Sequence, residues 1–160
     1  MSIRPITAAD DPAVAAIIRT VMTEYACSGE GFAIQDPEVD HMTQAYPGGP
    51  AQYYVVSAGG RVLGAGGFGP LAGVPASEQT CELRKMYFLP ALRGRGAGRA
   101  LLELLLQRMR DAGYRRCYLE TTEQMHAARQ LYTRLGFAAI CAPLGATGHH
   151  GCDRFYLRPL

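Results

Sequence analysis

The stretch from Met86 to Gly113 constrains the fold of this chain more than any other part of the sequence. It begins as an apolar strand, continues through a loop rich in glycine and arginine, and ends as an amphipathic segment. In that last segment apolar residues recur at helical spacing, which predicts a helix packed on a core. Gly113 follows the last periodic residue and predicts the end of the helix. The apolar positions are Ala97, Ala100, Leu101, Leu104, Leu105 and Met109.

The loop in front of this helix combines the features of a phosphate-binding site. Glycines lack a Cβ atom, so the backbone can bend sharply and come close to a ligand. A helix N-terminus adds free N–H groups and the positive end of the helix dipole, and arginine suits phosphate geometry. We therefore predict a phosphate or pyrophosphate site, the alternative being a flexible loop with solvated arginines. The residues concerned are Arg93, Gly94, Arg95, Gly96, Ala97, Gly98 and Arg99.

Two common nucleotide-binding patterns do not fit this loop. No Lys-Ser or Lys-Thr pair follows the glycines, which excludes a P-loop, and the dinucleotide pattern G-x-G-x-x-G fails at Arg99. Gly64, Gly66 and Gly69 satisfy the dinucleotide pattern formally, but Pro70 follows them where a helix is required. That segment instead predicts a glycine-rich strand with a close backbone approach or a bulge.

Two segments carry a resemblance to a known family. The loop matches R-x-x-G-x-G from Arg93 to Gly98 and resembles the acetyl-CoA pyrophosphate loop of the GNAT N-acetyltransferase superfamily. The segment Ala128–Phe137 resembles the second family signature, A-x-x-L-Y-x-x-x-G-F, and follows the first in the family order. Motif-level likeness covers Cys81 to Phe137. The resemblance implies one N-acetyltransferase domain over residues 1–160 that uses acetyl-CoA.

The order of predicted elements indicates an α+β fold, with a mixed, mostly antiparallel, twisted sheet flanked by helices. This is also the order expected of a GNAT domain. Turn residues Gly59 and Gly60 predict a hairpin between two of the strands. Strands are predicted over Ser2–Ile6, Tyr53–Ala58, Arg61–Phe68, Cys81–Leu89, Tyr114–Thr121, Ala138–Cys141 and Asp153–Leu157, and helices over Val14–Tyr25, Asp36–Tyr46, Ala97–Met109 and Met125–Leu135.

Composition limits the classes of partner. With 160 residues, of which 48% are hydrophobic and 19% charged, the chain can bury the core of one globular domain. A net charge of +2 is too small to favour nucleic acid or an anionic membrane. The five cysteines show no short paired spacing, so no disulfide framework is predicted. No signal-peptide core or transmembrane run occurs. We therefore expect a cytoplasmic protein.

The resemblance assigns roles to the strand that precedes the loop. It implies that this strand separates from the next one, and that pantetheine lies in the gap against the main chain of Met86 and Phe88. A backbone N–H near Met86 would then polarise the thioester carbonyl. Tyr132, in the Leu-Tyr pair of the second signature, would protonate the leaving thiolate. A phenol suits this task because the reference pKa values of phenol and thiol lie within roughly two units.

Glu82 is the predicted base that removes a proton from the amine. It lies four residues before Met86, so strand alternation predicts that both side chains project to the same side. Many members of the family carry a glutamate at about this place. Alternatively, Glu82 pairs with Arg84 or Lys85. Secondary candidates for the base are Glu120, His126 and Cys81.

Three further features lie outside a simple match. Met125 stands where the family often has an asparagine that helps to bind coenzyme A, so one hydrogen bond is lost there. Arg129 and Arg134 either reach the nucleotide or are solvated helix charges. The run His149-His150-Gly151-Cys152-Asp153 has metal-ligand residue types, but its spacing fits no standard zinc pattern, and we predict no metal. A polar loop near the acceptor or an ordinary surface loop fits this run better.

The leading hypothesis is an N-acetyltransferase in which acetyl-CoA and a deprotonated amine meet in a ternary complex. The amine attacks the thioester directly, since no cysteine or serine motif argues for an acetyl-enzyme. The expected acceptor is a small-molecule amine or amino-acid-like metabolite. Its selection falls to Cys27–Pro50, Leu71–Ser77 and Leu144–Asp153, which match no substrate signature. A non-catalytic acyl-CoA-binding module and an interaction domain remain alternatives, and a homodimer is allowed because dimers are common in the family.

Overall fold

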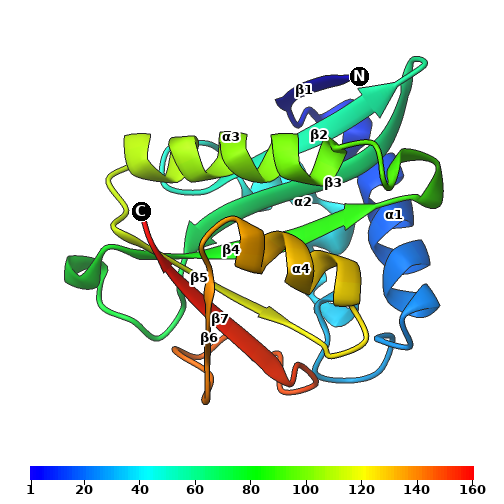
Figure 1. The fold of residues 1–160 in the computed structure, drawn as a ribbon. Coiled ribbons are helices and arrows are strands. Elements are labelled where there is room, and N and C mark those ends of the chain that lie inside the picture. The colour runs from blue at the N-terminus through cyan, green and yellow to red at the C-terminus, as the bar shows by residue number, and fades with distance from the viewer.

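Seven strands form one sheet, in the order β1-β2-β3-β4-β5-β7-β6 (Figure 1). The computed structural model describes residues 1–160. Every neighbouring pair of strands is antiparallel except β4 and β5, which confirms the predicted mixed, mostly antiparallel sheet. The strands are β1 (Ser2–Pro5), β2 (Gln52–Ala58), β3 (Arg61–Pro70), β4 (Thr80–Phe88), β5 (Arg116–Thr121), β6 (Ala138–Ile140) and β7 (Arg154–Pro159).

Helices cover both faces of this sheet (Figure 1). One face packs against α3 (Ala97–Asp111) and α4 (His126–Arg134), and the other against α1 (Asp11–Glu24) and α2 (Met42–Ala45). Just before α1, the Asp10 carboxylate accepts the Thr7 backbone N–H at 2.9 Å, as in a capping box. No helix is both long enough and apolar enough to span a membrane.

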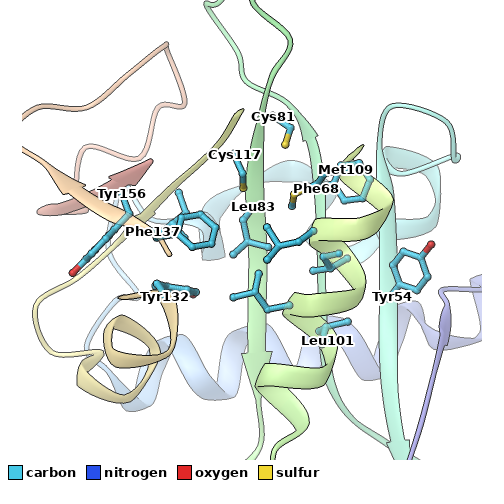
Figure 2. Packing of buried hydrophobic residues seen from close by; sticks show 14 of the residues in the cluster. Tyr54, Phe68, Cys81, Leu83, Leu101, Met109, Cys117, Tyr132, Phe137 and Tyr156 are labelled. Carbon is cyan, nitrogen blue, oxygen red and sulfur yellow. The ribbon is translucent and has the colours of Figure 1, made fainter. Parts of the chain in front are cut away.

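The larger part of the core lies between the sheet and α3 with α4 (Figure 2). Leu101 from α3 and Leu83 from β4 meet there, and the ring of Tyr132 from α4 closes one side against Phe137 and Tyr156. Each fully buried aliphatic side chain contributes about 1.5–3 kcal/mol relative to an exposed one. This packing fixes α3 and α4 on the sheet, and with them the two sequence signatures.

The parallel strands β4 and β5 pair only at their beginnings. Their register runs from Thr80 opposite Arg116 to Glu82 opposite Tyr118 and then stops, although both strands continue. The expected separation of the strand before the glycine loop from its neighbour is therefore confirmed. The gap leaves the second half of β4 without a partner on that side.

A bulge at Lys85 reverses the side-chain alternation within β4. Lys85 has a φ of 48°, and the register against β3 shifts between Ala65 and Gly67. After the bulge, Met86 packs on the α3 side, whereas Glu82 projects to the α1 side. The prediction that Glu82 and Met86 share one face is therefore wrong, because strict alternation does not hold across a bulge.

The glycines of β3 make room for the unpaired half of β4. A Cβ atom at Gly64 would lie 2.3 Å from the ring of Phe88, and one at Gly66 would lie 2.8 Å from Cγ of Met86. The predicted close approach and bulge are both confirmed at this strand. It is a sheet element and not a dinucleotide loop.

The predicted helix over residues 36–46 is divided into two short pieces. Pro37–Asp40 forms a 3-10 turn, and α2 begins only at Met42, because His41 has non-helical backbone angles. The Asp11 carboxylate accepts hydrogen bonds from the N–H and hydroxyl of Thr43, at 3.0 and 2.6 Å. A tertiary contact thus sets the start of α2, which helical periodicity cannot show.

Candidate active site

A groove of about 490 Å3 runs along the glycine loop, the end of β4 and the side of α4. All of the predicted cofactor residues line it except Arg95. These are Met86, Phe88, Arg93, Gly94, Gly96, Ala97, Gly98 and Arg99, joined by Leu131 of α4 and by Tyr25 and Met125, which flank α1 and α4. The structure therefore brings the two sequence signatures to one surface.

The glycine loop has the backbone shape of an anion site. Gly94 and Gly96 have φ angles of 72° and 77°, in the left-handed region that favours glycine. Gly96 is the N-cap of α3, and no side chain caps this end of the helix. The first N–H groups of α3 therefore remain available for a ligand.

The arginines of this loop differ from one another in what they contact. The guanidinium of Arg93 binds Glu24 at 2.6 and 2.7 Å and donates to the carbonyl of Phe88 at 2.8 Å, which fastens the loop to the end of α1. Arg99 is largely exposed and pairs with Glu103 on the next helical turn. Arg93 thus has a structural task that the sequence pattern did not reveal.

A second, small cavity of about 60 Å3 occupies the gap between β4 and β5. It shares Met86, Tyr87, Met125 and Ala128 with the groove, so the two spaces meet at the unpaired half of β4. Its wall also contains Leu83 and Lys85 of β4, Leu119, Glu120 and Thr121 of β5, Tyr132 of α4, and Cys27 and Cys152. The cavity therefore connects the cofactor-side groove with charged groups on the other face.

Tyr132 lines this small cavity from the α4 side. Its ring is 6% exposed and packs against Phe137 and Tyr156, with centroid distances of 5.9 and 6.2 Å. Burial raises the pKa of the phenol well above its usual value, so the hydroxyl stays protonated. A neutral phenol held at a cavity wall can donate a hydrogen bond or a proton.

A network of charged side chains lies next to the cavity on the α1 face and reaches it through Lys85. The Lys85 ammonium lies 2.7 Å from both Asp36 and Glu38, and Nε2 of His149 lies 3.0 Å from Asp36. Burial opposes ionisation of Asp36, but contacts with His149 and Lys85 outweigh it and lower its pKa. The sequence analysis missed Asp36, Glu38 and Lys85 as site residues, since they meet only in the fold.

The predicted base Glu82 is buried beside this network but lines neither the groove nor the small cavity. Its carboxylate accepts from Nε of Arg84 at 2.7 Å, which is the pairing that the sequence left open as an alternative. Glu120 projects into the cavity instead. Burial raises the pKa of Glu120, although hydrogen bonds from Tyr118 and Thr147 act in the opposite direction.

Residues with metal-ligand chemistry gather here, but they come from different segments of the chain. Glu82, Glu120 and His149 place one donor atom each within 4.8 Å of one another. Each of them already has a partner. Glu82 accepts from Arg84, Glu120 accepts from Tyr118 and Thr147, and His149 contacts Asp36. His150 turns away toward Gly31, and Cys152 lines the cavity. The His-His-Gly-Cys run therefore provides separate contacts and not one ligand set.

Comparisons with known sequences place this arrangement among acetyltransferases. The sequence model of the family described as "Acetyltransferase (GNAT) family" matches residues 18–137. The protein named "Uncharacterized N-acetyltransferase YjgM" from Escherichia coli (strain K12) is 42% identical over 158 residues, which cover 98% of this chain and 93% of that protein. "N-acetyltransferase family 8 member 2" from Rattus norvegicus is 28% identical over 109 residues, or 68% of this chain and 45% of that protein.

Solved structures share the fold over the full length of the chain. An acetyltransferase of the GNAT family from Staphylococcus aureus Mu50 has a TM-score of 0.86 at 18% identity, with 99% of this chain and 98% of that chain covered. The yncA protein from Salmonella typhimurium, solved with its cofactor acetyl-CoA, has a TM-score of 0.78 at 23% identity, with 100% and 94% covered. These likenesses confirm the predicted α+β fold.

Proposed function

The chain belongs to the acetyltransferase (GNAT) family, and from this premise we propose that it transfers an acetyl group from acetyl-CoA to the amine of a small-molecule or amino-acid-like acceptor. The observation that carries the proposal is the junction of the groove with the small cavity. The groove on one face of the sheet meets a small cavity that exposes Lys85 and Glu120 toward the other face, at the unpaired half of β4. Two substrates can approach each other there from opposite sides.

The residues of the groove fit coenzyme A chemically. The uncapped N-terminus of α3 and the loop glycines suit the pyrophosphate. The mostly apolar wall formed by Met86, Phe88, Leu131 and Leu135 suits the pantetheine arm. The unpaired edge of β4 leaves main-chain groups that an extended chain of amides can pair with. When bound, acetyl-CoA supplies an activated thioester.

This chain's own residues would orient the reactants and move protons. We assign to the N–H of Met86 the polarisation of the thioester carbonyl, and to Tyr132 the protonation of the sulfur that leaves. Direct attack in a ternary complex needs both substrates in place, and the two adjoining spaces support this order of events. Most of the rate enhancement would then come from proximity and from the polarised carbonyl.

The acceptor would enter from the α1 face. Two of the segments predicted to select it reach the small cavity or its charged border, with Asp36 from one and His149 and Cys152 from the other. The carboxylates there favour a cationic or hydrogen-bonding amine over an anionic acceptor. A small amine or an amino-acid-like molecule satisfies these conditions.

The test combines calorimetric titration with acetyl-CoA and a thiol-release assay over amino acids, aliphatic diamines and short peptides. We expect binding with an affinity in the micromolar range, together with release for one acceptor class and a mass gain of one acetyl group on the amine. Binding without release for any acceptor would favour the alternative function, a non-catalytic acyl-CoA-binding module. Absence of binding would overturn the proposal.

A further inference from the structure

An amine acceptor must lose a proton before it can react, and no residue has yet been assigned to remove it. At neutral pH most primary amines are ammonium ions, and only the neutral form attacks a thioester. Acetylation of an ammonium ion therefore releases one proton overall, together with the amide and the free thiol. The inference that follows rests on the proposed function and concerns where this proton goes.

Glu120 is the carboxylate that faces the reaction space. It lines the small cavity together with Tyr132 and Met86, whereas Glu82 lines neither space. The side chain of Glu120 is 4% exposed, so water from outside does not reach it freely. Glu82 also binds the Arg84 guanidinium at 2.7 Å, so its carboxylate is already held by a partner away from both spaces. Position and pairing both select Glu120.

The environment of Glu120 suits proton transfer. Its carboxylate accepts the Tyr118 hydroxyl at 2.7 Å and the Thr147 hydroxyl at 3.0 Å, which fix its orientation. Burial, with Glu82 as a like charge nearby, raises its pKa toward the range where a general base is effective. The titratable groups that surround the cavity or face Glu120 are Glu82, Lys85, Tyr87, Tyr118, Tyr132, Cys27, His149 and Cys152.

His149 connects Glu120 with the protein surface. Its Nδ1 lies 3.8 Å from Glu120, which is longer than a hydrogen bond, and its Nε2 lies 3.0 Å from Asp36. The Asp36 side chain is 22% exposed and therefore reaches solvent. Asp36 is held in place by Lys85 at 2.7 Å. Glu120, His149 and Asp36 thus follow one another from the cavity to water, with a gap of 3.8 Å between the first two.

We infer that Glu120, and not Glu82, removes the proton of the acceptor amine, and that His149, oriented by Asp36, carries it to solvent. The ammonium ion loses its first proton to Glu120, and the relay delivers that proton to water. The neutral amine then attacks, so the C–N bond forms and the C–S bond breaks. The second amine proton passes to Glu120, Tyr132 protonates the sulfur, and Glu120 returns its proton to Tyr132. The products are the amide, the free thiol and one released proton.

The first test compares Glu120→Gln with Glu82→Gln by their pH profiles of kcat/KM, using the amine that the wild-type protein acetylates fastest in the acceptor panel. Gln retains an oxygen that accepts from Tyr118 and Thr147. We expect kcat of Glu120→Gln to fall by about 10²-fold or more, with unchanged calorimetric affinity for acetyl-CoA. Its residual rate should rise with pH as the free amine does. In Glu82→Gln, kcat should fall by less than about tenfold, and the acid side of the pH profile of kcat/KM should match that of the wild type.

Chemical rescue separates a catalytic role from a structural one. Glu120→Ala leaves space in the cavity, and added formate should restore part of its activity while leaving Glu123→Gln, an exposed carboxylate control, unaffected. His149→Gln is expected to lose about tenfold in kcat, with recovery in imidazole buffer because a small base replaces the relay.

Three results would overturn the inference. The first is a larger fall in kcat in Glu82→Gln than in Glu120→Gln, together with an altered acid side of the pH profile in Glu82→Gln. The second is loss of acetyl-CoA affinity in Glu120→Gln, and the third is failure of formate to act on Glu120→Ala while that variant still binds acetyl-CoA. A wild-type protein that binds acetyl-CoA but acetylates no amine would instead remove the proposed function itself.

Discussion

The two faces of the sheet meet at the gap between β4 and β5, and they are built in different ways. On the α3 face the groove consists of glycine backbone, a helix N-terminus and apolar side chains from contiguous sequence segments. On the α1 face Lys85 and Glu120 line the small cavity, and Asp36 and His149 lie behind them, so that four separate segments contribute. One face therefore offers main-chain groups to a ligand, and the other offers an ion-paired network.

This difference suggests a division of tasks. In the proposed function, main-chain groups would recognise what every acyl-CoA has in common, a pyrophosphate and a chain of amides, and would tolerate substitution of most side chains. The charged network depends on each of its members, because a buried ion left without a partner is strongly destabilising. Substitutions on the α1 face should therefore change stability and acceptor chemistry, whereas those in the groove should change cofactor affinity.

The largest effect on stability is expected for Lys85→Met. Removing the ammonium leaves Asp36 and Glu38 facing each other without the cation that lies 2.7 Å from each. We expect the free energy of unfolding in urea to fall by about 3 kcal/mol. Calorimetric affinity for acetyl-CoA at low temperature should stay close to the wild-type value. A parallel loss of affinity would show that the two faces are not separable.

Tyr132→Phe tests the point where the faces join. The variant keeps the packing of the ring against Phe137 and Tyr156 but removes the hydroxyl that lines the small cavity. We expect kcat to fall by about 10²-fold with unchanged affinity for acetyl-CoA, measured by thiol release and calorimetry. Unaltered turnover would remove the assigned role of the tyrosine as an acid.

Asp10→Asn calibrates the acid sensitivity of the fold at a place remote from both faces. The Asp10 carboxylate binds Arg4 at 2.6 and 2.8 Å, and this contact lowers its pKa from the usual 3.8 to about 2. Because this pKa is lower in the folded protein, the carboxylate stabilises the fold at a pH above the unfolded-state pKa of 3.8. This stabilisation is lost as the pH falls from 3.8 toward 2. We expect the free energy of unfolding of the variant to be lower by about 2 kcal/mol near neutral pH. Its stability should also depend less steeply on pH in the acid range. A wild-type acid limb in the variant would contradict this assignment.

Gly96→Ala and Gly113→Ala form a matched pair for the groove. Both glycines have left-handed backbone angles, and a Cβ atom at either position meets nothing within 4 Å. Each variant should therefore lose about 1–2 kcal/mol of stability. Only Gly96→Ala should also lower the affinity for acetyl-CoA, by about tenfold. The strained backbone would relax there and move the N–H groups at the start of α3. Equal affinities in the two variants would exclude a role for the loop conformation.

Much of the fold was predictable because local patterns specify it. Helical periodicity located α3, and the Gly59-Gly60 turn located the hairpin of β2 and β3. The groove was also predictable, since the loop from Arg93 to Gly98 and the segment Ala128–Phe137 carry their own backbone requirements. These features depend on residues that lie close together in the chain.

The acceptor side was not predictable for the opposite reason. The bulge at Lys85 depends on how β4 registers with β3, and it moved Glu82 to the face opposite Met86. Asp36 and His149 lie far apart in sequence and meet only after the sheet has formed. No spacing or composition signal records such a contact. The sequence singled out Glu120 and His149 by residue type alone, and it could not show where either side chain lies in the fold.

The central claim is that the acetyl group reaches the gap between β4 and β5 from the groove side. A crystal structure of the protein with acetyl-CoA tests it most directly. We predict electron density for the pyrophosphate at the loop from Arg93 to Gly98, and for the acetyl thioester in the small cavity between Tyr132 and Glu120. A thioester bound outside this cavity, or a pyrophosphate away from the loop, would contradict the account.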